Sequence, residues 1–274
     1  MKIVLAKTSG FCKGVERAVN LTLQQPINSR CVLGSLVHNS EVIENIKQNG
    51  IAFETEPKLD YSEFVISAHG VPFGVVEKLE GKTVLDATCP NVRKLFSVSS
   101  RCKDDVCLII VGNSEHIEVA NALSFSDNYL CLPNDRVADD LLSDILKTDF
   151  SKYFLAFQTT TARSIADEYS EKIKQLLGYR VEIVDTVCSA VEKRVSEAVE
   201  IAKKVDFMIV IGDKKSANCK TVFEECQKAN QSVCFVETPS DLPIIEAETV
   251  GVTAGASVPK SQIQRVIDDL KSKK

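Results

Sequence analysis

The stretch that decides the fold is TVLDATCPNV, at residues 83–92. It recurs as VEIVDTVCSAV at residues 181–191, and in a looser form as IVLAKTSGFCKGV at residues 3–15. In each copy, apolar residues typical of a strand lead to a cysteine, and a helical pattern of apolar residues follows. We therefore expect each cysteine to lie between the carboxyl end of a strand and the amino end of a helix. The three cysteines are Cys12, Cys89 and Cys188.

Two further markers repeat along the chain. Apolar runs ending in glycine occur at residues 32–34, 108–112 and 208–212, and a functional side chain follows four residues after each. These side chains are His38, His116 and Ser216. The cysteines are 77 and 99 residues apart and the glycines 78 and 100 apart, so both belong to one repeat. The other marker is a strand-like run, whose register is defined to within about one residue; its copies lie at residues 64–70, 154–160 and 250–257.

Strands that alternate with helices predict βαβ units and parallel sheets, with ligands bound outside the carboxyl ends of the strands. We expect an α/β fold of three pseudo-threefold-related modules, a trefoil, each with a mainly parallel sheet. The expected modules cover residues 12–88, 89–187 and 188–274, and the N-terminal strand segment 1–11 joins the third. In this arrangement the three cysteines meet at one central site.

The composition excludes several classes of protein. The chain has 274 residues, of which 44% are hydrophobic and 26% charged, as in ordinary soluble proteins. Lys and Arg number 33 against 38 Asp and Glu, so we expect no nucleic-acid or membrane partner. No apolar stretch is as long as a membrane span, and the N-terminal apolar run is too short for a signal peptide. We expect a cytoplasmic protein whose ten cysteines are reduced.

The ten cysteines fall into three groups. Four lie in strand-like apolar runs and are expected in the core: Cys31, Cys107, Cys131 and Cys234. Three are undecided but are not expected to be ligands: Cys102, Cys219 and Cys226. The remaining three share the repeat position and lack the C-x2-C pairs of zinc ribbons and bacterial ferredoxins. Thiolates select soft metals, and an iron-sulfur cube held by only three cysteines leaves one iron open to substrate. We therefore expect a catalytic iron-sulfur centre, with a zinc-dependent hydrolase as an alternative.

All three histidines of the chain, His38, His69 and His116, lie at strand ends that the repeat defines. Histidine at a helix amino end can bind an anion, and the third module offers neutral donors at matching positions. These donors are Ser216, Asn218 and Ser257. The pattern predicts a phosphate cradle, but the P-loop lysine motif of nucleotide-binding proteins is absent. Beside a metal site, Glu118 is the candidate proton donor, and Thr159 could orient it.

In order and combination, these motifs resemble the 4-hydroxy-3-methylbut-2-enyl diphosphate reductase, or LytB, family over nearly the whole chain. The matching segments are GFCKGV (10–15), LVHN (36–39), SAHG (67–70), DATCP (86–90), QTT (158–160), DTVC (185–188) and GVTAGAS (251–257). The resemblance implies a trefoil around an oxygen-sensitive 4Fe-4S cluster with three Cys ligands. It also implies the last step of the non-mevalonate isoprenoid pathway.

The resemblance further implies roles for individual residues. The catalytic set would be Glu118, Thr159 and His116. The substrate-binding set would be His38, His69, His116, Thr159, Ser216, Ala217, Asn218 and Ser257, and the metal set Cys12, Cys89 and Cys188. The substrate hydroxyl would bind the open iron, and removing it as water requires two electrons and two protons. In the family the electrons come from a ferredoxin or flavodoxin.

Three positions depart from the family pattern: Ile117 replaces a proline, Ala217 a serine and Val191 a threonine. Losing one hydroxyl donor to a charged oxygen costs about 1.5–3 kcal/mol. We therefore expect the departures to affect efficiency more than the type of reaction. The divergence after Cys188 keeps one further alternative open, a non-enzymatic iron-sulfur sensor or a paralogue that binds a diphosphate metabolite.

Overall fold

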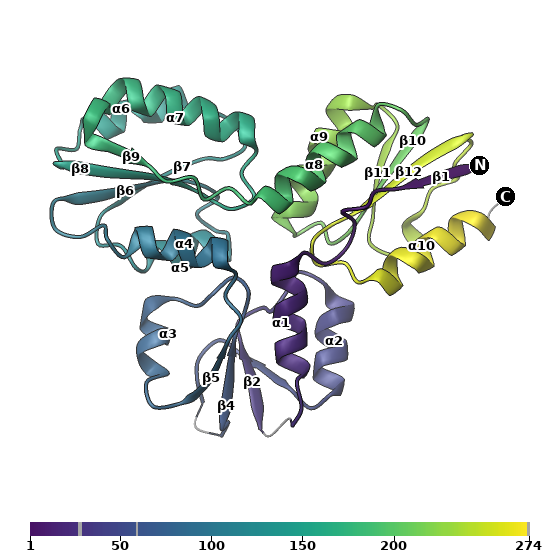
Figure 1. Ribbon diagram of the computed structural model, residues 1–274, viewed down its shortest axis with the longest axis horizontal. Helices are drawn as coiled ribbons and strands as arrows, with labels where there is room; N and C mark the ends of the chain where they lie inside the picture. Colours follow the sequence, from purple (N-terminus) through teal and green to yellow (C-terminus); the bar gives the residue numbers. More distant parts are fainter. Residues whose placement is uncertain (27–28, 59, 273–274) are drawn as a thin grey trace. The chain divides into compact units, whose positions relative to one another are not determined.

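A computed structural model describes residues 1–26, 29–58 and 60–272 (Figure 1). The chain forms two compact units. Unit 1 comprises Met1–Arg17, Val37–Gln48 and Ser189–Lys274, and unit 2 comprises Ala18–Leu36 and Asn49–Cys188. The chain passes between the units four times, and the first passage falls within helix α1 (Lys13–Leu23).

Unit 2 contains two sheets, each of four parallel strands. The first has the order β3-β2-β4-β5. Its strands are β2 (Arg30–Leu33), β3 (Ala52–Glu54), β4 (Glu63–Ile66) and β5 (Thr83–Asp86). Helix α3 (Phe73–Lys78) adds Val75 to the core of this sheet, beside Cys31 and Phe64. Strand β2 is therefore buried along its whole length.

The second sheet of unit 2 has the order β7-β6-β8-β9. Its strands are β6 (Val106–Val111), β7 (Tyr129–Leu132), β8 (Lys152–Phe157) and β9 (Val181–Ile183). Helices lie on both faces (Figure 1). One face carries α4 (Pro90–Ser99) and α5 (Ile117–Leu123), and the other α6 (Asp139–Leu146) and α7 (Arg163–Leu177), which ends in the 3-10 turn η1 (Gly178–Arg180). Two separate apolar cores result.

Unit 1 contains the third sheet, in the order β1-β12-β10-β11, again parallel. Its strands are β1 (Lys2–Leu5), β10 (Phe207–Ile211), β11 (Val233–Val236) and β12 (Thr249–Ala254). Helices α8 (Ser189–Ala202) and α9 (Ala217–Ala229) pack on one face and α10 (Lys260–Ser272) on the other. The unit also includes α2 (Ser40–Gln48) and the turn η2 (Pro239–Asp241). The N-terminal strand therefore completes a sheet whose other strands come from the last third of the chain.

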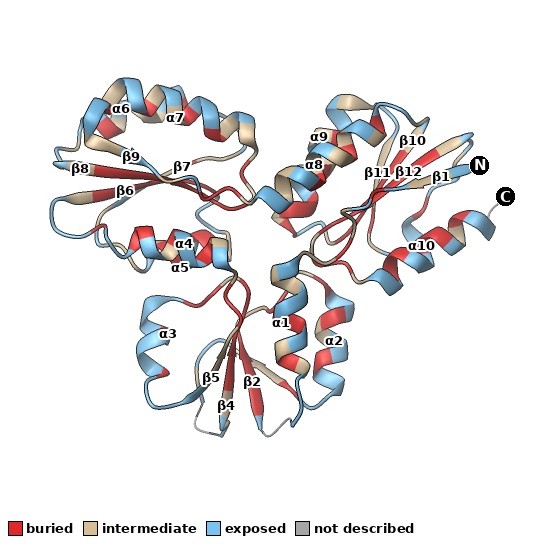
Figure 2. Ribbon diagram, viewed as in Figure 1, coloured by how far each residue is buried: buried red, intermediate tan, exposed pale blue. Residues whose placement is uncertain are grey.

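The three sheets have the same strand order. In each, the strand directly before the repeated glycine is second in space, and it is almost wholly buried (Figure 2). Parallel strands covered on both faces are expected to be continuously apolar, as these are. The outermost strands β1, β5 and β9 are more exposed, and each leads to one of the three repeated cysteines.

The predicted α/β fold class of three repeated parallel sheets is therefore confirmed. The module boundaries 12–88, 89–187 and 188–274 stay a prediction. The division into two compact units does not test a division into three modules. Within the described residues, we find no helix with the length and apolar character needed to cross a membrane.

Candidate functional site

The same backbone hydrogen bond fixes each of the three repeated cysteines. The N–H of Cys89 donates to the carbonyl of Ala68 at 3.0 Å. The N–H of Cys188 donates to Thr159 O at 2.9 Å, and that of Cys12 to Ala256 O at 3.2 Å. These bonds make Ala68, Thr159 and Ala256 equivalent, and so give the register that the sequence defined only to within about one residue.

The repeated glycines share a second bond. The N–H groups of Gly34, Gly112 and Gly212 donate to the carbonyls of Glu54, Leu132 and Val236 at 2.7, 2.8 and 2.9 Å, respectively. Added Cβ atoms at Gly112 and Gly212 would lie 2.7 Å from Val119 Cγ2 and 2.4 Å from Cys219 Sγ. Because Cys219 fills the space that Val119 fills in the second sheet, it acts as a small core residue.

The other cysteines outside the trio are buried in the core or, for Cys131 and Cys234, partly buried against it. Four lie in strands, as predicted: Cys31, Cys107, Cys131 and Cys234. Cys102 and Cys226 belong to the apolar clusters beside α4 and α9. Burial raises the pKa of all seven thiols, to about 11 for Cys31, Cys102 and Cys234 and about 12 for Cys107 and Cys226. Raised thiol pKa values disfavour the thiolate needed for metal binding.

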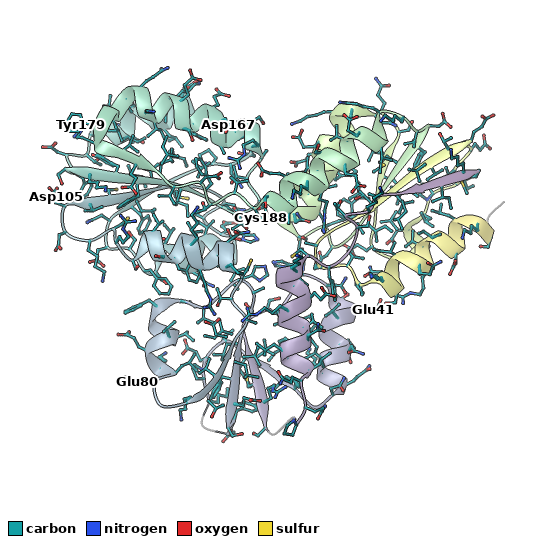
Figure 3. All side chains as sticks on the ribbon, viewed as in Figure 1. Glu41, Glu80, Asp105, Asp167, Tyr179 and Cys188 are labelled. Atoms are coloured by element: carbon teal, nitrogen blue, oxygen red, sulfur yellow. The ribbon has the colours of Figure 1, made fainter. Side chains whose placement is uncertain are left out.

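Cys12, Cys89 and Cys188 have a different setting. Each directly precedes a helix and is partly exposed, and none forms a disulfide. Cys188 is labelled in Figure 3, beside the start of α8. A helix amino end stabilises negative charge, so these positions suit thiolate ligands of a soft metal.

The metal set itself stays a prediction. Cys12 belongs to unit 1, whereas Cys89 and Cys188 belong to unit 2. Across residues 1–26, 29–58 and 60–272, the structure shows no group of three or more His, Cys, Asp or Glu side chains that could hold a metal ion. The donor chemistry of the three thiols fits an iron-sulfur group, and the amide of Asn91 donates to Cys188 Sγ at 3.1 Å.

Glu118 and Thr159 are joined by two hydrogen bonds in unit 2. Glu118 is 2% exposed, on the first turn of α5. Its Oε1 accepts from the Thr159 backbone N–H and its Oε2 from the Thr159 hydroxyl, both at 2.7 Å. Burial raises the pKa of this carboxyl, and the two bonds from Thr159 partly oppose the rise. A carboxyl with a raised pKa retains a proton closer to neutral pH, as a general acid requires.

His116 and His69 lie beside this pair. His116 caps α5, and its Nδ1 accepts from the Glu118 backbone N–H at 3.2 Å. This bond assigns the ring proton to Nε2, which is then a donor. The rings of His69 and His116 meet edge to face, with centroids 6.1 Å apart. Two of the three predicted histidines, His69 and His116, therefore lie together in unit 2.

A second cluster lies in unit 1. Ser216 caps α9 by accepting from the Cys219 N–H. Asn218, 7% exposed, accepts at Oδ1 from the Ala256 N–H at 3.0 Å and from Arg194 Nη1 at 3.4 Å. In the part of the chain that the structure describes, Asn218 Nδ2 is buried and has no hydrogen-bond partner. With its oxygen held by two donors, Asn218 can offer its N–H2 group to an anion.

His38 and Ser257 are also together in unit 1, because the Ser257 hydroxyl donates to the His38 carbonyl at 2.9 Å. The helix cap at this point is Asn39, whose Oδ1 accepts from the Val42 N–H. The first module therefore has one more residue between glycine and cap than the other two. Burial lowers the pKa of His38, and the charge of Asp213 partly opposes this.

Sequence reasoning missed two residues of these clusters. Arg194 is 4% exposed, and its Nη2 donates to the Gly10 carbonyl at 2.7 Å in addition to the bond with Asn218. Asn91 lies two residues after Cys89 and contacts the sulfur of Cys188. No local sequence pattern predicts that an arginine on a helix is buried. The amide of Asn91, by contrast, lies in the segment TCPN (88–91) beside the predicted ligand Cys89, and this position could have indicated its role. Ala217 and Ile117, predicted departures, are the first residues of α9 and α5.

Comparison with known proteins gives relatives over the full length of the chain. A reductase of 4-hydroxy-3-methylbut-2-enyl diphosphate from Nitratidesulfovibrio vulgaris (strain Miyazaki F) is 32% identical, covering 97% of this chain and 98% of the relative. The enzyme of the same name from Alkaliphilus oremlandii is 32% identical, covering 98% of each chain.

Two solved structures share the fold. One is (E)-4-hydroxy-3-methyl-but-2-enyl diphosphate reductase, described as the terminal enzyme of the non-mevalonate pathway, with a TM-score of 0.70, 26% identity and coverage of 99% of this chain and 100% of that one. The other, from Plasmodium falciparum, has a TM-score of 0.80, 25% identity and coverage of 97% and 87%. The family model described as LytB protein matches residues 3–271, and the chain therefore belongs to the LytB family.

Proposed function

We propose that this chain reduces 4-hydroxy-3-methylbut-2-enyl diphosphate to isopentenyl diphosphate and dimethylallyl diphosphate. Its relatives and structural neighbours are reductases of that substrate. The observation that carries the proposal is a chain of hydrogen bonds from Glu118 through Thr159 to the backbone of Cys188. It joins a buried carboxyl, suited to proton donation, to a predicted metal ligand.

The reaction replaces a hydroxyl group by hydrogen. The allylic C–O bond breaks, two electrons enter, one proton converts the departing hydroxyl to water, and a second proton forms the new C–H bond. Protonation at one end of the allyl unit gives isopentenyl diphosphate, and at the other end dimethylallyl diphosphate. The protein must therefore deliver one proton to the departing oxygen and one to the allyl unit.

Glu118 is the proton donor in this proposal. Its burial favours the protonated form, and the Thr159 hydroxyl holds the carboxyl in one orientation. Thr159 can pass a proton between Glu118 and the substrate oxygen, because a hydroxyl both donates and accepts. His116 fixes the start of α5 and presents Nε2–H as a donor. The catalytic set is thus Glu118, Thr159 and His116.

The diphosphate is held by neutral and imidazole donors. The proposed substrate-binding set is His69, His116 and Thr159 in unit 2 and His38, Ser216, Asn218 and Ser257 in unit 1, with the backbone N–H of Ala217. In the structure, the hydroxyls of Thr159 and Ser257 donate to Glu118 and to the His38 carbonyl, and they must turn to reach the diphosphate. Asn218 is the best defined of them, since its Oδ1 already accepts two bonds and Nδ2 is left to donate. A helix amino end at Ser216 adds partial positive charge.

The LytB family implies an iron-sulfur cofactor. We propose a 4Fe-4S cluster with Cys12, Cys89 and Cys188 as its three ligands, because these thiols are the partly exposed ones at helix starts. When bound, such a cluster supplies electrons one at a time and a Lewis-acid iron for the substrate hydroxyl. A ferredoxin or flavodoxin as electron donor and a cytoplasmic location complete the proposal.

The test is anaerobic. We expect purified protein to contain iron and acid-labile sulfide, and to convert 4-hydroxy-3-methylbut-2-enyl diphosphate with a strong one-electron chemical reductant. Cys12→Ser, Cys89→Ser and Cys188→Ser should each lower the iron and sulfide content and abolish turnover. Cys131→Ser is the matched control, because this thiol lies in β7 and burial raises its pKa; it should keep both.

Other outcomes identify the alternatives. A full cluster without turnover would indicate a sensor or a diphosphate-binding paralogue. Stoichiometric zinc in anaerobically prepared, colourless protein would indicate a hydrolase. Either result would overturn the proposed reaction while leaving the fold and family unchanged.

A further inference from the structure

Asn91 occupies an unusual place in unit 2. It is the second residue of α4, directly after Pro90, and it is partly buried. Its Nδ2 donates to Cys188 Sγ at 3.1 Å, although the two residues are 97 positions apart in the chain. The bond therefore links the start of the helix after one predicted ligand to the sulfur of another.

The repeat makes this amide distinctive. Asn91 lies two residues after Cys89, and the equivalent positions after Cys12 and Cys188 are Gly14 and Ala190. Neither glycine nor alanine has a side-chain donor. Among the three repeats, only the one that begins at Cys89 can place a side-chain N–H against a ligand sulfur in this way.

The backbone of Cys188 also makes a hydrogen bond. The Cys188 N–H donates to Thr159 O, and Thr159 in turn holds both oxygens of Glu118. Cys188 is thus fixed at its backbone and at its sulfur. A hydrogen bond to a ligand sulfur withdraws electron density, so it stabilises the more negative, reduced state of an iron-sulfur cluster and raises its reduction potential.

We propose that Asn91 is a positioning residue that raises the reduction potential of the cluster through its hydrogen bond to Cys188 Sγ. The inference rests on the proposed function, because it requires the cluster and Cys188 as a ligand. Its consequence is that a weaker reductant can reduce the centre than would suffice without the amide.

The experiment compares wild type with Asn91→Leu, which has a similar shape but no donor, and Asn91→Ala, which removes the donor without adding bulk. Ser97→Ala, at an exposed position of the same helix, is the control. Anaerobic redox titration followed by electron paramagnetic resonance measures the midpoint potential, and iron and sulfide are determined on the same samples.

We expect Asn91→Leu and Asn91→Ala to keep their iron and sulfide and to have a more negative midpoint potential than wild type and Ser97→Ala. The expected shift is on the order of tenfold in the equilibrium constant of reduction, which equals about 59 mV for one electron. Asn91→Ala decides the question if Asn91→Leu does not fold. Unchanged midpoints in cluster-containing variants would overturn this inference alone, whereas wild-type protein without a reducible cluster would overturn the proposed function as well.

Discussion

Glu118 in unit 2 and Asn218 in unit 1 occupy the same position of the repeat, six residues after Gly112 and Gly212. Both side chains are buried at the start of a helix, and an oxygen of each accepts a backbone N–H from the end of a neighbouring strand. The donor is Thr159 for Glu118, at 2.7 Å, and its equivalent Ala256 for Asn218, at 3.0 Å.

The two positions differ in the second polar atom of each side chain and in its hydrogen-bond partner. Thr159 also has a hydroxyl, which binds the second oxygen of Glu118, so that carboxyl is fully held. Ala256 has no hydroxyl, and the second polar atom of Asn218 is an amide nitrogen that keeps its donors. The repeat therefore supplies one backbone setting. In the proposed function, side-chain identity makes this position a proton donor in unit 2 and a hydrogen-bond donor to the diphosphate in unit 1.

The largest effect is expected for Glu118→Gln, which keeps the shape but removes the ionisable proton. We expect kcat to fall about 10²–10⁴-fold, the usual contribution of a general acid. Diphosphate affinity and iron content should stay near wild type, since the amide oxygen can still accept from Thr159. Anaerobic turnover, with inorganic diphosphate binding as the control, checks this, and wild-type turnover would exclude Glu118 as the proton donor.

The same substitution changes the dependence of stability on pH. Burial raises the Glu118 pKa above its unfolded value, so the folded state binds the proton more tightly. This contribution to stability is complete below the unfolded pKa and is lost as pH rises through the folded pKa. Urea unfolding at several pH values should show that part of the slope in wild type and not in Glu118→Gln.

The next largest effect is expected when the Asn218 position of unit 1 is given a carboxylate like that of Glu118 in unit 2. Asn218→Asp puts a carboxylate where unit 1 offers an amide, while Oδ1 can still accept from Ala256 and Arg194. Repulsion from the diphosphate should weaken its binding roughly 10²-fold, as like charges cost several kcal/mol. Asn218→Ala, which only removes a donor, should lose less. Calorimetric titration with inorganic diphosphate decides, and equal losses in the two variants would argue against a charge effect.

The sequence predicted the sheets and helix starts that carry Glu118 and Asn218 better than it predicted the side-chain contacts around them. The repeat around Cys12, Cys89 and Cys188 gave the parallel sheets and the helix starts, because strand and helix patterns are local. It could not show that Arg194 is buried, since its partner Gly10 O lies 184 residues away and a helix arginine is ordinarily solvated. It also equated His38 with His116, whereas the extra residue in the first module gives the cap to Asn39.

Arg194 offers a smaller and sharper test, because it has no counterpart in the bonding of Glu118. Arg194→Met keeps the bulk but frees Asn218 Oδ1 from one of its two donors, so the amide is less well oriented. We expect about tenfold weaker diphosphate binding, or about 1.4 kcal/mol, which is slightly less than the roughly 1.5–3 kcal/mol of a direct bond to a charged group, because Arg194 acts only through Asn218. If Arg194 acts through Asn218, the loss should nearly vanish in an Asn218→Ala background, and Arg194→Lys should recover part of it. Fully additive losses would contradict this coupling.

The smallest expected effect is a proton count. Burial lowers the pKa of His38 below its ordinary value of 6.5, with Asp213 opposing, so at neutral pH the ring is neutral in the free protein. A bound diphosphate brings negative charge, which favours the imidazolium form of His38 and raises its pKa in the complex. Binding therefore takes up a fraction of a proton. The affinity for diphosphate must rise as the pH falls from the pKa of His38 in the complex towards its lower pKa in the free protein. The rise is at most about tenfold per pH unit for one proton.

Calorimetry in buffers of different ionisation enthalpy measures the proton uptake. His38→Asn removes only the contribution of this residue, so the titration of diphosphate itself remains as an internal reference. Identical uptake in wild type and His38→Asn would mean that His38 does not respond to the diphosphate, and that the neutral donors around Asn218 hold it in unit 1.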